Sequence, residues 1–385
     1  LLLLNDLPGV KARSILSPGA AAGASLLTTE VTQGPRLSGH VDFDNYGNKF
    51  SGAWRVGAGL NLNDLTGYGD QLTLRVSDSS GVRYGRAAYL LPVGTTGLKI
   101  GAAYAELGYE LCCDFAALRV KGDAQVASST ALYPLVRRRD FSLYGTATYD
   151  HRHFFNSTLT GTTSDKNVDV GMFSIRGNSR DFLGGGGLNT FGLVLSTGYL
   201  NLDGWAQDRV ADSTTARSHG SYQKLSYLLA RLQKLGERIS LYAAFSGQIA
   251  SSNLDSSEKF SLGGPLAVRA YPQGEAFGDE YMLLNLALRY NVTQNLQTAL
   301  FFDHGEIRLH HDPWEGWQGT NTRIHNSYGL SGYGVGLNWS LPENFLMRVG
   351  VAQRIGDNPG RSMSGLDSDN ARHSPRLWLQ LVKYF

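Results

Sequence analysis

The chain has no hydrophobic run long enough to cross a membrane as a helix, because no stretch approaches the roughly 18 uncharged apolar residues that such a span requires. Charged residues are also sparse, at 18% of the chain, against about 25% in typical soluble domains. Hydrophobic residues nevertheless reach 42%, which is enough to form a core. Helical membrane proteins and disordered chains are therefore both excluded.

Cysteine is nearly absent, and the two cysteines of the chain, Cys112 and Cys113, are adjacent. Adjacent cysteines rarely close a relaxed disulfide because the required geometry is strained. A metal site would need further ligands close by. We interpret the two residues as thiols or as a vicinal pair, without a catalytic role.

An excess of one charge sign is also missing, since the net charge is only +2. A protein that binds nucleic acid usually carries a basic excess on one segment. The densest basic run here is the short cluster Arg137–Arg139, which we interpret as a solvated turn. We therefore expect no nucleic-acid partner.

Glycine and aromatic residues are abundant instead: 47 of the 385 residues are glycine, and Phe, Trp and Tyr together reach 11%. Apolar residues alternate with polar residues or glycine in many segments, which is the pattern of strands with two different faces. In residues 54–62, for example, the apolar face holds Trp54, Val56, Ala58, Leu60 and Leu62. The sequence therefore predicts an all-β protein, either soluble or of the outer-membrane type.

Sixteen segments show this strand pattern, and lengths of about 9–11 residues suit tilted spans of a membrane barrel. They lie near residues 37–45, 52–62, 70–78, 82–92, 97–107, 121–134, 141–150, 167–176, 187–201, 221–233, 239–249, 280–290, 296–305, 329–340, 345–355 and 376–385.

The connections between these segments alternate in length. Short turns such as NDLTGYG (63–69), LVRRRD (135–140) and LPEN (341–344) alternate with longer polar connections. The longest connections follow the strands that end near Asp150, Asn201, Ala250, Gly305 and Gly356. Short turns at one end and long loops at the other are typical of an up-and-down membrane barrel. Because sixteen is even, both termini are predicted to emerge at the short-turn, periplasmic end.

Several charged residues fall on the strand faces that we assign to the barrel interior: Asp42, Asp44, Arg55, Arg75, Arg348 and Arg354. A charge on a lipid-facing position would cost ~2–4 kcal/mol at the bilayer midplane. The interior is therefore predicted to be hydrated, which permits conduction or the passage of a protein. Glycines in the strand segment Gly332–Gly336 are expected to provide close packing or lumen space.

Four stretches carry a more specific pattern. Leu4–Val31 contains an LPGV turn, a PG dipeptide and a final strand, and Phe43–Leu72 has the form of a hairpin with its turn. Val268–Glu280 has the sequence VRAYPQGEAFGDE, and Phe301–Gly305 has the sequence FFDHG. Together they resemble the two-partner secretion transporter family, TpsB, which carries a VRGY/F motif in a long sixth extracellular loop and an FxDxG strand motif. The resemblance runs in order along essentially all 385 residues.

The resemblance implies two parts. Residues 1–33 would be the C-terminal part of a second POTRA domain, an α+β module, and residues 34–385 a 16-stranded antiparallel transmembrane β-barrel. A loop near 251–279 would fold back into the barrel, where Arg269 would pair with Asp303. The residues implied in this loop-lock motif are Val268, Arg269, Ala270, Tyr271, Phe301, Asp303 and Gly305.

Strand alternation agrees with part of this implication, because it places Phe301 and Asp303 on one face and Leu300 on the other, so that Asp303 points to the lumen. On the residues alone, an ordinary edge strand with a solvated arginine is the favoured interpretation of Val268–Tyr271. The motif departs from the family in having Ala270 in place of Gly. A second departure is Ala287, which stands where many relatives have Glu.

The resemblance also implies a function. The chain would export one large β-rich partner, a TpsA exoprotein, across the outer membrane of a Gram-negative bacterium without nucleotide, with residues 1–33 in the periplasm. Phe385, a terminal aromatic residue on the last strand, resembles the outer-membrane assembly signal. Expected partners are the exoprotein, outer-membrane lipid and lipopolysaccharide, and the barrel-assembly machinery. No cofactor is expected.

A passive porin and a barrel-assembly insertase remain alternatives that share the barrel. A porin would need neither the N-terminal segment nor the VRAYP loop. An enzyme is disfavoured because the chain contains no GxSxG nucleophile elbow and no persuasive nucleophile–base pair. We interpret His310–Asp312 as a surface loop rather than a metal site, and Gly184–Gly187 as a flexible turn rather than a phosphate cradle.

Overall fold

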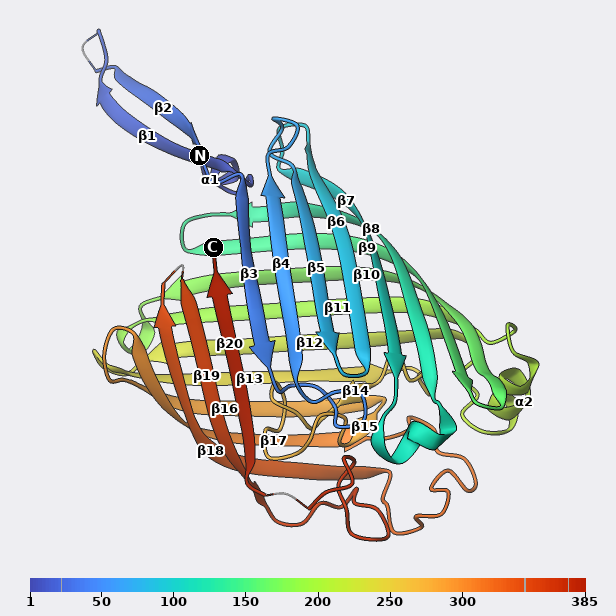
Figure 1. The fold of residues 1–385 in the computed structure, drawn as a ribbon. Coiled ribbons are helices and arrows are strands. Elements are labelled where there is room, and N and C mark those ends of the chain that lie inside the picture. Colours follow the sequence, from blue (N-terminus) through green and yellow to red (C-terminus); the bar gives the residue numbers. More distant parts are fainter. Residues whose placement is uncertain (22, 343, 373) are drawn as a thin grey trace.

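Sixteen antiparallel strands close into a barrel in the computed structural model, which describes residues 1–21, 23–342, 344–372 and 374–385 (Figure 1). The strands are β3 (Leu37–Asp44), β4 (Arg55–Asn63), β5 (Gln71–Ser79), β6 (Val82–Val93), β7 (Leu98–Glu110), β8 (Lys121–Arg137), β9 (Phe141–Thr158), β10 (Gly161–Asp181), β11 (Gly187–Asn201), β12 (Gly220–Lys234), β13 (Ile239–Ala250), β16 (Glu280–Asn291), β17 (Leu296–Arg308), β18 (Ser327–Leu341), β19 (Phe345–Ile355) and β20 (Arg376–Tyr384). Each overlaps one predicted segment, so the predicted all-β, 16-stranded barrel is confirmed.

Each barrel strand pairs with the next one in sequence, and β20 pairs with β3 to close the circle. The two remaining short strands, β14 (Phe260–Ser261) and β15 (Phe277–Gly278), pair with each other within the connection between β13 and β16. Short turns join the strands at one end, where both chain termini lie. Longer loops join them at the other end, except between β5 and β6 and between β9 and β10 (Figure 1). The alternation of connection lengths and the shared end of the termini agree with the prediction.

The predicted long connection after Asp150 is wrong. Strand β9 has 18 residues and β10 has 21, and only Leu159 and Thr160 separate them. The three residues after Asp150 are polar on both faces of β9, with Arg152 turned to the lumen and His153 to the outside. The hydrophobic alternation therefore ends before the hydrogen-bonded ladder does.

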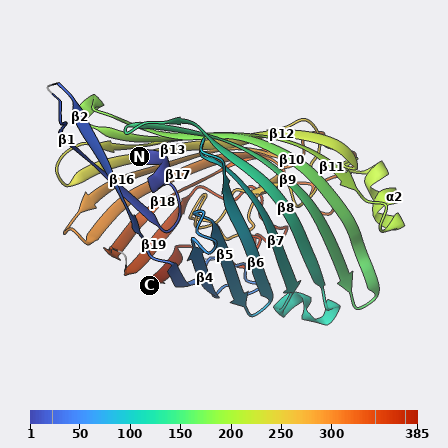
Figure 2. The same ribbon diagram turned by 90° about the horizontal axis from the view of Figure 1, so that it is seen from above.

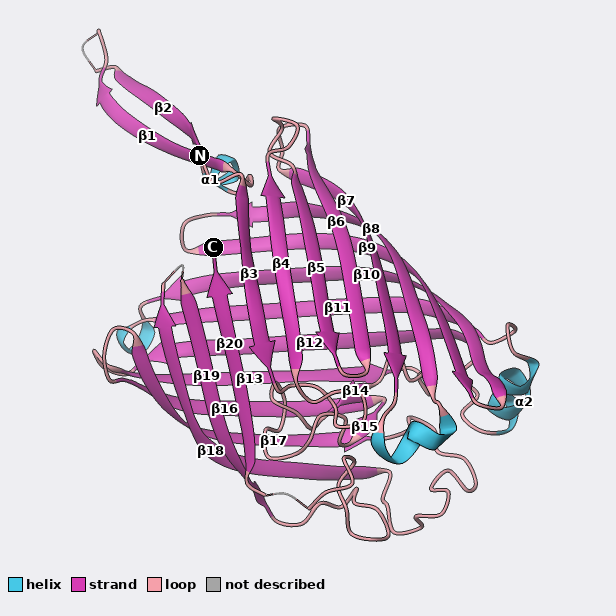
Figure 3. Cartoon of the chain, viewed as in Figure 1, coloured by secondary structure: helices cyan, strands magenta, loops and turns pink. Residues whose placement is uncertain are grey.

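Helices are few and short (Figure 3). The long-loop end carries α2 (Ala206–Thr214) and the 3-10 turn η1 (Cys113–Leu118), and η2 (Leu183–Gly185) forms part of a short turn. Within the described ranges, no helix is both long and apolar enough to span a membrane. The predicted LPEN turn includes Glu343, which lies outside the described residues.

The pairing between β20 and β3 is short. It comprises five residue pairs, from Gln380 opposite Asp44 to Tyr384 opposite His40. The Asn45 side chain extends this contact at one end, because its amide donates to the Leu377 carbonyl at 2.8 Å and its oxygen accepts from Leu379 N–H at 2.8 Å. At the other end, the backbone of Phe385 exchanges hydrogen bonds of 2.9 and 3.0 Å with Gly39. Contacts of the Asn45 side chain and of Phe385 thus extend this short pairing, which we call the β20–β3 seam.

Residues 1–33 form a separate unit at the short-turn end, consisting of α1 (Leu2–Asn5) and a hairpin of β1 (Val10–Pro18) with β2 (Ser25–Gln33). Seen from above, the hairpin lies toward one side of the barrel end (Figure 2).

This unit is joined to the barrel through Asp6, whose carboxylate accepts two hydrogen bonds from Arg137, at 2.8 and 2.9 Å. Lys99 Nζ donates to the Asp6 carbonyl at 2.6 Å. The interpretation of Arg137 as solvated is therefore wrong, because its partner is 131 residues away in the sequence.

The buried apolar core lies inside the barrel. It combines side chains of the loop between β13 and β16 with the inner wall: Leu262, Ala267, Val268, Ala270, Tyr271, Ala276, Leu283, Ala287, Phe301, Ile307, Leu330 and Ala352. On the outer wall, apolar side chains such as Val56, Val76 and Leu300 are more than half exposed. An apolar exterior around a partly filled interior is the arrangement expected of a membrane barrel.

Candidate functional site: a loop anchored in the lumen

The connection of residues 251–279 folds back into the barrel and fills part of the lumen. Its backbone is ordered internally, because Leu262 N–H donates to the Ala276 carbonyl at 2.9 Å and Gly263 N–H donates to the Glu275 carbonyl at 2.9 Å. Gly274, at φ +95°, adopts a backbone conformation that side chains rarely allow. The loop is therefore a compact structure rather than a mobile surface segment.

At the centre of this loop, Arg269 contacts Asp303 of strand β17. The guanidinium donates two hydrogen bonds of 2.7 Å, from Nε to Oδ2 and from Nη2 to Oδ1. The backbone N–H of Arg269 adds a third, at 3.1 Å to Oδ2, and Asn285 Nδ2 a fourth, at 2.7 Å to Oδ1. Asp303 is fully buried. The pair is bidentate and geometrically specific.

The surrounding wall also fixes the arginine. The guanidinium carbon lies 3.4 Å from the centroid of the Phe301 ring, the geometry of a cation–π contact. Trp378 on β20 donates from its indole nitrogen to the Arg269 carbonyl at 2.7 Å. Two strands that are not neighbours therefore hold one loop residue.

Small residues allow the loop to approach the wall this closely. A Cβ atom at Gly332 would collide with the Cβ of Ala270, and one at Gly305 would lie 2.5 Å from Leu262. One at Gly334 would lie 2.5 Å from the Phe301 ring. Gly332 and Gly334 of β18 thus provide the close packing expected from the sequence.

The structure brings the seven sequence-predicted loop-lock residues together. Val268, Ala270 and Tyr271 are buried beside the arginine, with Phe301 and Gly305 on the facing strand. The Tyr271 hydroxyl has no hydrogen-bond partner among the described residues. Burial raises the pKa of this phenol to about 12. Phe385 lies apart from this site, at the short-turn end of the seam.

Sequence reasoning missed two members of the site. Asn285 lies two residues before Ala287 on the same inner face of β16 and donates a hydrogen bond to Asp303. Ala287 itself only packs in the buried apolar cluster. Strand alternation could have placed Asn285 in the lumen. No local signal indicated that the Trp378 indole reaches the loop backbone.

Five of the six charges assigned to the interior take part in ion pairs, with partners on nearby strands or in a loop. Asp44 accepts from Arg55 at 2.8 Å, and Asp42 forms an ion pair with Arg75. Arg354 pairs with Asp367 of the loop between β19 and β20. The sixth, Arg348, donates a hydrogen bond to Gln380. These parts of the inner wall are thus polar.

No group of three or more His, Cys, Asp or Glu residues in the described part of the chain is arranged to hold a metal ion. His310 packs between Trp314 and Trp317, with ring centroids at 4.5 and 5.4 Å, and is not an exposed loop residue. Burial is the main cause that lowers the pKa of His310, to about 4, and the nearby Lys259 ammonium acts in the same direction.

Cys112 and Cys113 form a vicinal disulfide, which decides between the two alternatives left by the sequence.

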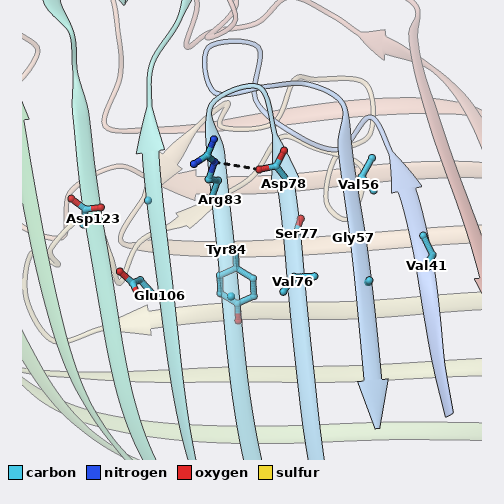
Figure 4. Close-up of a pocket in the computed structure, with 13 residues that line it drawn as sticks. Val41, Val56, Gly57, Val76, Ser77, Asp78, Arg83, Tyr84, Glu106 and Asp123 are labelled. Atoms are coloured by element: carbon cyan, nitrogen blue, oxygen red, sulfur yellow. Dashed lines mark ion pairs between the residues drawn. The ribbon is translucent and has the colours of Figure 1, made fainter. Parts of the chain in front are cut away.

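A hollow of about 640 Å³ on strands β3–β8 lies outside the lumen (Figure 4). Its floor includes the outward-facing Val41, Val56 and Val76, and its rim includes the ion pair of Arg83 with Asp78. Because this hollow faces the surroundings of the barrel, it does not belong to the loop site.

The fold and the site define a class: an outer-membrane-type barrel of sixteen strands whose lumen holds an anchored loop. The family model described as haemolysin secretion/activation protein ShlB/FhaC/HecB matches residues 23–339. The chain belongs to this family, so the resemblance to two-partner secretion transporters is confirmed.

Individual relatives are similar to the chain over most of its length. The chain is 27% identical over 398 residues to the heme/hemopexin transporter protein HuxB of Haemophilus influenzae, covering 100% of this chain and 66% of that protein. It is 23% identical over 352 residues to the hemolysin transporter protein HpmB of Proteus mirabilis, covering 85% and 58%. The chain thus spans less than two thirds of the length of these relatives.

Among solved structures, CdiB from Escherichia coli superposes with a TM-score of 0.78 at 18% identity, covering 100% of this chain and 69% of that one. At this identity the superposition supports the fold.

Proposed function

We propose that this chain is the barrel part of a two-partner secretion transporter, which passes one large β-rich exoprotein through its lumen across the outer membrane. Membership of the family supports the general class. The observation that carries the proposal is the bidentate contact of Arg269 with Asp303, because it holds a removable loop inside an otherwise hydrated channel. A simple pore has no need of such a lock.

In this proposal the loop of residues 251–279 closes the channel at rest and yields to the exoprotein. An extended chain must displace the loop tip, and hydrated charges on the inner wall can exchange partners with it at small cost. No nucleotide is required, because folding of the β-rich cargo outside the cell makes transport directional.

Residues 1–33 are proposed to be the C-terminal part of a second POTRA domain in the periplasm. The helix and hairpin seen here fit such a module, and all nine residues of β2 are exposed. An extended substrate can add to an exposed strand edge through backbone hydrogen bonds. The barrel would occupy residues 34–385.

The proposed location is the outer membrane of a Gram-negative bacterium, with lipid and lipopolysaccharide around the barrel. Phe385 is proposed to serve as the signal read by the barrel-assembly machinery. Epitope tags inserted near Asp212 or Gly319, at the long-loop end, should be reachable on intact cells, whereas tags at Arg138 should not. The Leu159–Thr160 turn is a further accessible position, whereas Asn156 lies within β9.

The direct test is co-expression of the full-length transporter with the large exoprotein encoded beside its gene. Secretion of the exoprotein into the medium supports the proposal, and its retention in the periplasm contradicts it. Steady single-channel conductance that is unchanged by the exoprotein would instead identify a porin. Rescue of cells depleted of their essential barrel-assembly factor would identify an insertase.

A further inference from the structure

A second group of charges holds the lumen loop, on a different part of the wall from Asp303. Glu258 of the loop forms ion pairs with Arg152 on β9 and with Lys224 on β12, the latter at 2.7 Å. Asp255 pairs with Lys166 on β10 at 2.7 Å. Three loop-to-wall ion pairs thus meet within four loop residues.

These charges are withdrawn from water and balanced. The Glu258 side chain is 2% exposed, and those of Lys166 and Asp255 are 9% and 10% exposed. Asp150, which pairs with Arg152 at 2.8 Å, brings the set to three acids and three bases. Ionised groups are buried in this way only when they are paired, so each member requires its partner.

The titration of Asp255 agrees with this reading. Its burial acts to raise its pKa, but the Lys166 ammonium together with hydrogen bonds from Ser257 brings the pKa below its usual value. The loop carboxylate is therefore held in the charged form that the pair needs.

Hydrogen bonds to backbone carbonyls strengthen the same attachment. Lys224 Nζ donates to the Glu258 carbonyl at 3.0 Å. Gln248 on β13 donates from Nε2 to the carbonyls of Glu258, at 3.2 Å, and Asp279, at 2.9 Å. The two ends of the loop are thereby tied to the wall and to each other.

The stem of the loop is closed just inside this attachment. Lys259 pairs with Asp279 at 2.8 Å, and β14 pairs with β15 immediately beyond. The tip of the loop, residues 262–276, therefore begins after a closed stem. It is anchored separately, through the contact of Arg269 with Asp303 on β17. Among the described residues, the base and the tip share no ion-pair partner.

We propose that Arg152, Lys166 and Lys224 are positioning residues that keep the loop base, residues 255–258, on the β9–β12 wall as a fixed hinge while the tip is released from Asp303. The inference rests on the proposed function only in assuming that the tip must leave the lumen. It predicts that the base and the tip of the loop detach from the barrel wall independently of each other.

Hydrogen exchange of the purified full-length protein in detergent or nanodiscs, read by mass spectrometry, tests this directly. In Arg269→Ala, amides of residues 262–276 should exchange at least tenfold faster, while those of 253–260 keep the wild-type rate. In Glu258→Gln, and in Lys166→Ala combined with Lys224→Ala, exchange in 253–260 should rise at least tenfold. Arg348→Ala, which removes a lumen arginine that donates a hydrogen bond to Gln380 on β20, is the matched control.

Heat-modifiable migration on gels verifies that each barrel is folded. Glu258→Gln alters only the loop, so it provides the test if the wall variants fail to assemble. A simultaneous rise of both segments in Arg269→Ala, or unchanged exchange of 253–260 in Glu258→Gln, would overturn the hinge. The measurement involves no exoprotein, so its outcome is separate from whether the chain exports one.

Discussion

The indole nitrogen of Trp378 donates a 2.7 Å hydrogen bond to the carbonyl oxygen of Arg269, and so joins the loop motif to the strand that closes the barrel. The side chain of Arg269 binds β17, while its backbone binds β20. Two intervening strands separate these attachments. The tip of the loop therefore spans a sector of the inner wall that ends at the β20–β3 seam.

Trp378→Phe removes the donor and keeps an aromatic ring in place. A hydrogen bond of this kind contributes about 0.5–1.5 kcal/mol, so the population of the released tip should rise roughly two- to tenfold. Protease cleavage within residues 262–276 of the assembled barrel measures this change. The outward-facing Trp339→Phe is the control, and equal cleavage in the two variants would remove Trp378 from the site.

Arg269→Ala should greatly reduce exoprotein secretion and leave the amount of folded, heat-modifiable barrel nearly unchanged. Removing one partner of a buried pair costs about 3–5 kcal/mol in a dry core, and less in a wet lumen. Barrel stability itself rests on closed strand pairing. Asp303→Ala should behave alike, and secretion assays of the double variant should show no further loss.

Arg269→Lys extends this test, because an ammonium group cannot form the two parallel hydrogen bonds of the guanidinium fork. We expect it to restore little secretion. Additive losses from Arg269→Ala and Asp303→Ala would mean that the two residues act separately, and the lock would have to be abandoned.

Arg137→Ala should detach the N-terminal unit from the short-turn end, because the Asp6 carboxylate then loses both of its guanidinium hydrogen bonds. Spin labels on β1 and on the turn between β6 and β7 should report a broader distance distribution. The exchange of charges in Asp6→Arg with Arg137→Asp should narrow it again. Arg138→Ala is the neighbouring control, and an unchanged distribution in Arg137→Ala would show that other contacts set the orientation.

Acidification should loosen the loop of residues 309–326. His310 has a pKa of about 4 in the folded protein, against about 6.5 when unfolded, so the folded state binds fewer protons between these values. Its contribution to stability is therefore complete above about pH 6.5 and declines as the pH falls toward 4. Hydrogen exchange of this loop at pH 7.5 and 4.5, corrected for intrinsic rates, measures the effect.

His310→Phe keeps a ring against the two tryptophans and removes the titration, so the difference between the two pH values should shrink. The exposed His325→Asn should leave it unchanged. A pH response that persists in His310→Phe would assign it to another group.

Strand number and side-chain direction followed from the sequence alone, because a strand repeats every two residues and one face of a membrane barrel must be apolar. Phe301 and Asp303 were placed on the inner wall in this way. The contact of Asp303 with Arg269, by contrast, entered through family resemblance, since periodicity carries no information about which loop reaches which strand.

Only the tertiary structure decided the partners of isolated charges. Arg137 looked like a solvated turn until folding brought Asp6 beside it, and Glu258 showed no sequence signal that it would meet Arg152 and Lys224. Likewise, the polar residues directly after Asp150 concealed the continuation of β9, since backbone hydrogen bonding needs no apolar face. The local sequence pattern indicates which face of a strand contacts water. The pairing of side chains across the lumen depends instead on closure of the whole barrel.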